Sequence, residues 1–303
     1  MKLSITEEHI YNNLKAQVDA IFRHIRAGSY KTRLRYYAAV LRFLAFLAVE
    51  YHLENIRNIA SKHLVAYVEY MEALDLSAST IKTDLSAIRW FHDFIPNAKH
   101  ALPKNDELGI ELPRRVFAAE DRSWSDREYH EMCQVAIREG LPAYASAMAL
   151  ARYAGLRIHE VFRIDVAIAR EAIRKGAITI TGKGGKVRTV PANAECIKAL
   201  ADQLAVTAPG EKLFVGHDEH TDRAINRLQI FLWKYRDEVR DPANPVKPTF
   251  HGLRHTYAAE QYRRLREQGV SRLDAYLRVS KLLGHNRGEV TRLYISSVDE
   301  SSF

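Results

Sequence analysis

Two stretches near the end of the chain carry most of its chemical information: PTFHGLRHTYAAE, from Pro248 to Glu260, and KLLGHNRGEVTRLY, from Lys281 to Tyr294. The first places His251 and Arg254 one helical turn apart, directly after a proline and a threonine. At a helix start, the free backbone N–H groups and the helix dipole favour an anion. The second adds His285 and ends on a tyrosine nine residues later. Two histidines, an arginine and a tyrosine together suggest a site that holds and attacks a phosphate group.

Upstream of these stretches, the pattern predicts helices around one β-hairpin. The β-branched, alternating run Ala177–Thr181 and the run Val187–Pro191 flank the glycine turn GKGGK, which is typical of two antiparallel strands. A further short strand is expected at 213–215, and the chain is expected to be helical from Pro248 through Tyr294. The other helices are predicted at Ser125–Arg138, Pro142–Tyr153, a short segment from Leu156, Ala192–Val206 and Thr221–Val239.

Two basic residues in this part of the chain are candidate phosphate ligands. Arg157 follows a glycine at a helix start, and Glu160 lies one turn later on the same face, where it would orient the arginine. The ordinary explanation is a surface ion pair of little energy. Lys183 lies in the glycine turn, from which it could reach a ligand and donate a proton. That turn lacks the spacing of a phosphate loop, so a plain hairpin turn is the alternative.

The histidines and the tyrosine also have ordinary explanations. His251 and His255 have the i, i+4 spacing of a zinc site, but Gly252 stands where that motif needs glutamate and no third ligand has a suitable spacing, so no metal is expected. His255 and its neighbour Tyr257 fall on other faces of the helix, as core or supporting residues. Taken singly, His285 would be a capping residue after a helix-ending glycine, and the last tyrosine a packing residue.

Residues 5–95 are predicted to form four helices: Ile5–Ala27, Thr32–Tyr51, Ile59–Leu74 and Thr80–Phe94. The second is apolar almost all round, which indicates the central helix of a small bundle. Basic residues alternate with hydroxyl side chains along these helices, a composition able to follow a DNA backbone, although a solvated helix face explains it as well. These basic residues are Lys31, Arg33, Arg35, Arg42, Lys62, Lys82 and Arg89.

Composition and charge narrow the class of protein. The chain has 303 residues, a net charge of +8 and 47% hydrophobic residues, which indicates a folded protein that favours a polyanionic partner, nucleic acid before membrane. No apolar run reaches the ~18 residues that span a membrane, and the N-terminus does not resemble a secretory signal. The only cysteines, Cys133 and Cys196, fit a reduced cytoplasmic compartment. Several prolines near residues 96–125 indicate a linker, so we predict domains at 1–105 and 125–303 with a linker at 106–124.

The order and spacing of the candidate residues resemble those of tyrosine recombinases of the phage integrase family. AGLRIHEV at 154–161 matches the first family box and TGKGGK at 181–186 the hairpin lysine; HGLRHT at 251–256 matches the second box, and LGH at 283–285 the last. In the N-terminal part, STI at 79–81 and LSAIRWF at 85–91 are similar to the family's core-binding domain. His159, where a small residue is common, and the charged segment Asp165–Gly176 depart from the family pattern without touching a catalytic position.

The resemblance implies a fold that is mainly α with a small β-sheet: a SAM-like, four-helix core-binding domain followed by an α+β catalytic domain. It implies a site-specific recombinase or integrase that cleaves and rejoins DNA through a 3′-phosphotyrosine and exchanges strands through a Holliday junction. It also implies that neither metal, ATP nor another cofactor takes part. The alternatives are a type IB topoisomerase and a DNA-binding relative without catalysis. The implied catalytic residues are Arg157, Lys183, His251, Arg254, His285 and the nucleophile Tyr294, with Glu160 in support.

The implied partners are double-stranded DNA with paired half-sites, three further copies of the chain in a homotetramer on DNA, and accessory DNA-bending or directionality proteins. A location in the cytoplasm with the nucleoid, and a link to a mobile element, would follow. The predicted DNA contacts are Lys31, Arg33, Lys82, Arg89, Lys186 and Arg188.

Overall fold

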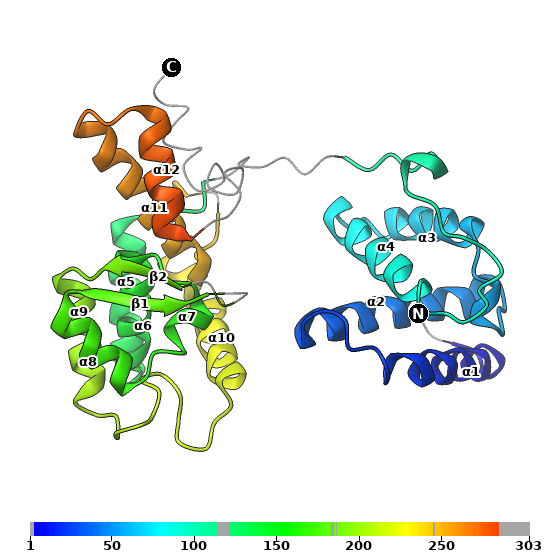
Figure 1. The fold of residues 1–303 in the computed structure, drawn as a ribbon, viewed down its shortest axis with the longest axis horizontal. Coiled ribbons are helices and arrows are strands. Elements are labelled where there is room, and N and C mark those ends of the chain that lie inside the picture. The colour runs from blue at the N-terminus through cyan, green and yellow to red at the C-terminus, as the bar shows by residue number, and fades with distance from the viewer. Residues whose placement is uncertain (1–2, 114–120, 183–184, 186, 245, 285–303) are drawn as a thin grey trace. The chain divides into compact units, whose positions relative to one another are not determined.

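A computed structural model describes residues 3–113, 121–182, 185, 187–244 and 246–284 (Figure 1). The chain divides into two compact units, Met1–Val116 and Phe117–Phe303. Each unit has its own hydrophobic core, so each is described by itself. Within the described residues, no helix combines the length and the apolar character that crossing a membrane requires.

The N-terminal unit contains the four predicted helices: α1 (Ile5–Phe22), α2 (Tyr30–Glu50), α3 (Ser61–Ala73) and α4 (Ala78–His92). Two single turns of 3₁₀-helix, Ile56–Asn58 and Asp106–Leu108, lie in the connections. Helix α2 packs against α1, α3 and α4, which confirms its predicted central position. Serines begin three of the helices by accepting a hydrogen bond from the backbone of the first turn, as N-caps do: Ser4, Ser29 and Ser77.

The C-terminal unit is built around helix α6 (Pro142–Ala154). This helix packs against α5, α9 and α11, and its many alanines allow the close approach of three neighbours. A two-stranded antiparallel hairpin lies beside α8, with Ile178 opposite Val190, as the alternating pattern predicted. The remaining elements are α5 (Asp126–Arg138), α7 (Ile158–Val161), α8 (Val166–Lys175), β1 (Ala177–Thr181), β2 (Val187–Pro191), α9 (Ala194–Leu204), α10 (Thr221–Val239), α11 (Phe250–Glu267) and α12 (Arg272–Leu283).

The predicted strand at 213–215 is wrong. In this segment only Lys212 forms a β-bridge, to Asp165, and the two residues that follow form a turn. Leu213 and Phe214 are 5% and 8% exposed, so their apolar character reflects burial in the core rather than a strand. The charged segment from Asp165 to Gly176 forms a helix that was not predicted, α8. The N-cap Asp165 accepts a hydrogen bond from the backbone N–H of Ile168. The charged residues later in the helix, such as Glu171 and Arg174, lie on its exposed side.

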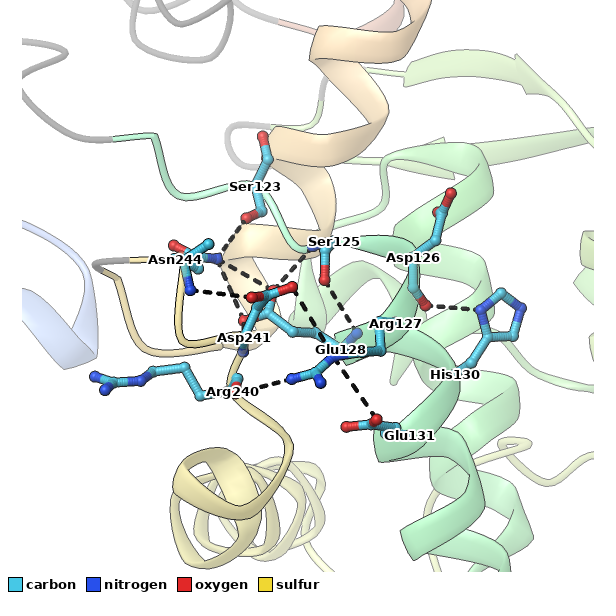
Figure 2. A network of polar contacts seen from close by, with 11 residues as sticks. Ser123, Ser125, Asp126, Arg127, Glu128, His130, Glu131, Arg240, Asp241 and Asn244 are labelled. Atoms are coloured by element: carbon cyan, nitrogen blue, oxygen red, sulfur yellow. Dashed lines mark hydrogen bonds and ion pairs between the residues drawn. The ribbon is translucent and has the colours of Figure 1, made fainter.

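A buried carboxylate fastens the start of this unit to the loop that leads into α11 (Figure 2). Glu128 is 0% exposed and accepts from the backbone N–H groups of Ser125 and Asp241, each at 2.9 Å. Its oxygens also accept from the Asn244 side chain, which in turn donates to the carbonyl of Ser123. Because a buried charge is tolerated only when it is well hydrogen-bonded, this network holds the loop before α11 in one position.

Candidate active site

The first turn of α11 places two of the predicted site residues. Thr249 caps the helix by accepting from the N–H of Gly252 at 3.2 Å, and its own carbonyl accepts from the Trp124 indole at 2.8 Å. His251 and Arg254 therefore lie one turn apart at a fixed helix start, as the sequence predicted. The N–H groups of this turn add a favourable field for an anion.

The Arg254 side chain joins two helix ends. It is 0% exposed and donates to the carbonyl of Gly155, which ends α6, and to the carbonyl of Leu283, which ends α12, the latter at 2.6 Å. Helix C-terminal carbonyls lack intrahelical partners and attract positive charge, so both ends are natural ligands for a guanidinium. The arginine is thus held in a set direction before any substrate arrives.

Arg157 lies at the start of α7 and is held by a buried carboxylate. Its backbone N–H donates to Glu160 at 2.7 Å and its guanidinium donates to the same carboxylate at 3.0 Å. Burial raises the pKa of Glu160, but hydrogen bonds from Arg188 and from the Arg157 backbone, together with the two positive charges, lower it to about 2. Glu160 is therefore a permanent anion, and Arg157, 28% exposed, keeps a face open to a ligand.

One cavity of about 350 Å³ brings Arg157, His251 and Arg254 together. Residues from α10 form its other wall: Gln229, Trp233 and Arg236. Sequence reasoning missed these three residues. A signal was present, because a tryptophan stands at helical spacing with a glutamine and an arginine on the polar face of α10, where it is 66% exposed. An open cavity with three arginines and an exposed aromatic ring is suited to a nucleotide phosphate.

The environment keeps both histidines of α11 neutral. Partial loss of water around the ring at the cavity wall, followed by the charges of Arg254, Arg157 and Arg122, lowers the pKa of His251 to about 4. Burial, followed by His251, lowers the pKa of His255 to about 3. His255 is 6% exposed, whereas His251 is exposed to the cavity. At neutral pH, His251 is therefore an uncharged imidazole able to accept a proton.

Ring-proton NMR titration of the free protein should find both imidazoles neutral at pH 5, where a histidine with the ordinary pKa of ~6.5 is mostly protonated. His251→Gln and His255→Gln would assign the two signals. Between the folded-state pKa of about 4 and the unfolded-state pKa of ~6.5, the folded protein binds fewer protons at His251 than the unfolded chain does. The free energy of unfolding should therefore be highest above pH ~6.5 and should decrease as the pH falls towards 4. A signal of either residue that titrates near pH 6.5 would contradict this electrostatic picture.

Gly155, at the end of α6, is constrained twice. Its φ is 62°, a left-handed conformation, and an added Cβ would overlap the ring of Tyr257, which is 4% exposed. Gly176 has the same φ of 62° with nothing within 4 Å of an added Cβ, so it provides a matched control. Both glycines end helices, so the two sites differ chiefly in packing.

We therefore expect Gly155→Ala to lower the free energy of unfolding of the C-terminal unit more than Gly176→Ala does. The backbone cost of ~1–2 kcal/mol is common to both variants, and overpacking against Tyr257 adds ~1–3 kcal/mol to the first alone. Denaturant unfolding of the full-length variants measures the difference. Equal losses would mean that the Tyr257 ring moves aside without cost.

Several predicted residues lie outside the described part of the chain: Lys183, Lys186, His285 and Tyr294. Their catalytic or DNA-binding roles stay predictions. His255 and Tyr257 are buried, as the helix-face argument predicted. Of the six predicted catalytic residues, the structure brings Arg157, His251 and Arg254 into one cavity.

The predicted DNA contacts of the N-terminal unit divide into two groups. Lys31 and Lys82 line a groove of about 580 Å³ between α2 and α4, together with Arg35. Arg33 and Arg89 are not among its lining residues; they donate to the carbonyls of Arg26 and Pro103, at 3.0 and 2.7 Å. In the C-terminal unit, the remaining described candidate, Arg188, is 11% exposed and bonded to Glu160.

Comparisons with known proteins agree with this arrangement. Residues 125–301 match the model of the phage integrase family, and residues 22–99 match the phage integrase N-terminal SAM-like domain. The chain is 30% identical over 290 residues to tyrosine recombinase XerC of Erythrobacter litoralis, covering 85% of this chain and 87% of that relative. It is 24% identical over 304 residues to tyrosine recombinase XerD of Halalkalibacterium halodurans, covering 95% and 93%.

Two solved structures share the fold. One is a lambda integrase dimer bound to a COC′ core site, with a TM-score of 0.61 and 17% identity over 91% of this chain and 96% of that one. The other is the Tn1549 transposon integrase in complex with circular intermediate DNA, with a TM-score of 0.60 and 16% identity over 95% and 98%.

Together, the helical fold with its small hairpin and the arginine–histidine cavity define a tyrosine recombinase, an enzyme of site-specific DNA recombination. The chain belongs to the phage integrase family. The predicted class and the predicted fold, mainly α with a SAM-like N-terminal domain, are confirmed.

Proposed function

We propose that this enzyme cleaves and rejoins double-stranded DNA at paired half-sites through a 3′-phosphotyrosine on Tyr294, and exchanges strands through a Holliday junction. The observation that carries the proposal is the cavity shared by Arg157, His251 and Arg254. Residues far apart in the chain come together there, and hydrogen bonds already hold the side chains of Arg157 and Arg254. A scissile phosphate is the ligand whose charge and size suit them.

The two arginines would stabilise the charge of the reacting phosphate. Arg157 is oriented by Glu160 and Arg254 by the carbonyls of Gly155 and Leu283, so both guanidinium groups are held beside the cavity before the phosphate binds. A preorganised donor of this kind typically contributes ~10²–10³ in rate. His285 would add a hydrogen bond to the same phosphate.

The proposed cleavage forms one bond and breaks one. The Tyr294 oxygen attacks phosphorus, and its proton passes to His251, whose low pKa leaves it neutral and able to accept. The bond from phosphorus to the 5′-oxygen breaks, and Lys183 protonates that oxygen. Rejoining reverses these steps with a 5′-hydroxyl from the other DNA strand. Since one phosphodiester replaces another, the exchange requires no ATP.

DNA contacts outside the active site would come from the groove between α2 and α4. Lys82 of α4 donates to the Pro113 carbonyl at 2.7 Å, and Arg35 of α2 donates to the Thr83 hydroxyl at 3.2 Å, so hydrogen bonds hold both basic side chains at the groove. Lysine, arginine and hydroxyl groups in such a groove suit a phosphate backbone. We also propose residues 106–124 as the interdomain linker, a homotetramer on DNA, and accessory DNA-bending or directionality proteins.

A nicked suicide substrate tests the proposal. Its short 5′-hydroxyl fragment diffuses away after cleavage, so the reverse reaction cannot occur and the covalent protein–DNA adduct accumulates. We expect an SDS-resistant adduct on the 3′ side of the cleaved strand in the presence of EDTA. A requirement for added metal would overturn the mechanism, whereas relaxation of plasmids without strand exchange between two sites would favour a type IB topoisomerase.

A further inference from the structure

Arg188 points into the protein from the second strand of the hairpin. It pairs with Ile180 across the hairpin, and its side chain is 11% exposed. Its two terminal nitrogens each donate to one oxygen of Glu160 at 2.7 Å. This two-bonded contact between planar groups fixes direction as well as distance.

The same carboxylate holds the phosphate-binding arginine of the proposed mechanism. Glu160 is 0% exposed and accepts two bonds from Arg157 as well as the two from Arg188. One buried anion therefore stands between two cations. Without Arg188, half of the hydrogen bonds that hold this carboxylate would be lost, and its orientation towards Arg157 would no longer be unique.

Arg188 also touches the end of α12. A Cβ built on Gly284 would lie 2.9 Å from Cδ of Arg188 and 3.3 Å from one of its terminal nitrogens. Only a glycine leaves room for this approach, and Gly284 has the left-handed φ of 65° that ends the helix. Arg188 therefore contacts both Glu160, which positions Arg157, and Gly284, which precedes His285 in the sequence.

We propose that Arg188 is a positioning residue for DNA strand cleavage, holding Glu160, and through it Arg157, in register with the hairpin and the end of α12. This inference rests on the proposed function. It also assigns Arg188 a role different from direct contact with DNA, since both of its terminal nitrogens are bonded to the Glu160 anion, which neutralises its charge.

Single-turnover cleavage of the suicide substrate by full-length variants separates the two roles. In Arg188→Met, we expect the rate constant for adduct formation to fall ~10–100-fold, the usual effect of losing a residue that orients a ligand-binding group. DNA affinity and its dependence on salt should match the wild type. A lost phosphate contact would instead weaken binding and reduce the salt slope by about 1.

Arg174→Met is the matched control. Arg174 makes a similar two-bonded contact, at 2.7 and 2.9 Å, to Glu171 on the exposed side of α8 and is 68% exposed. Its replacement should leave the cleavage rate constant unchanged. Arg188→Lys, which keeps the charge near Glu160 but loses the planar fork, carries the test if the methionine variant does not fold.

The rate constant must be read beside the final yield of adduct. Partial unfolding lowers the yield while the surviving molecules react at the normal rate, whereas a positioning defect lowers the rate constant of folded protein. Combining Arg188→Met with Glu160→Gln should slow cleavage no more than the worse single change, because both act through one carboxylate.

Three results would each overturn the positioning role. The first is a double variant whose loss of rate is the product of the two single losses. The others are a wild-type rate constant in both Arg188→Lys and Arg188→Met, and weakened DNA binding. Absence of any adduct with the wild-type enzyme would instead refute the proposed function, so the two failures are distinguishable.

Discussion

Tyr294→Phe is expected to abolish the covalent protein–DNA adduct while DNA affinity stays at the wild-type level. The change removes one oxygen, and that oxygen is the proposed nucleophile, so cleavage should fall by on the order of 10⁴ or more. The measurement is SDS-gel detection of the adduct formed with the suicide substrate, beside a gel-shift titration with intact DNA.

Tyr276→Phe is the control for this experiment. Tyr276 lies on α12, partly buried beside the small apolar cluster of α11 and α12, and its hydroxyl has no part in the proposed chemistry. Its variant should form adduct at the wild-type rate. An adduct that persists in the Tyr294 variant would assign the nucleophile to a different residue and sink the phosphotyrosine mechanism as written.

Arg157→Lys should slow cleavage by ~10²–10³, the loss expected when a preorganised donor to a developing oxyanion is removed. Lysine keeps the positive charge but lacks the planar fork that bonds Glu160 with one nitrogen and leaves others for the phosphate. Single-turnover rates at saturating DNA measure the effect on the chemical step, since binding is then complete.

Arg163→Lys provides the corresponding control, because Arg163 is exposed just after α7 and does not line the cavity. Its rate constant should match that of the wild type. If Arg157→Lys instead binds DNA more weakly but cleaves normally once saturated, Arg157 contributes only to ground-state binding, and its proposed role in the transition state is wrong.

Local signals in the sequence were sufficient for most helices and for the hairpin. Helix α5 begins at Ser125 as predicted, where the structure shows a capping box with Glu128, and alternation marked β1 and β2. Both patterns arise from backbone geometry within a few residues. The error at 213–215 has a physical origin as well. Leu213 and Phe214 are apolar because they enter the core, and burial alone does not distinguish a strand from a turn.

The cavity was less predictable than the motifs that surround it. The resemblance to tyrosine recombinases placed Arg157, His251 and Arg254 in one site, but it does not reveal which way a hairpin residue faces. Arg188 was therefore predicted to contact DNA, whereas in the structure it is bonded to Glu160 and lies against the end of α12. Trp233 was missed for a similar reason. An exposed tryptophan indicates a binding site only once the structure shows that it faces Arg157 and His251 across the cavity.

The bonds of Arg254 bear on how such an enzyme can be redesigned. Its guanidinium is bonded to the backbone of Gly155 and of Leu283, so three short motifs from distant parts of the chain share one set of hydrogen bonds. A chimaera that takes one motif from a relative keeps these bonds only where the new backbone places its carbonyl at the same position beside the guanidinium. The motifs are therefore best exchanged together, with the helices that carry them, as a single inherited unit.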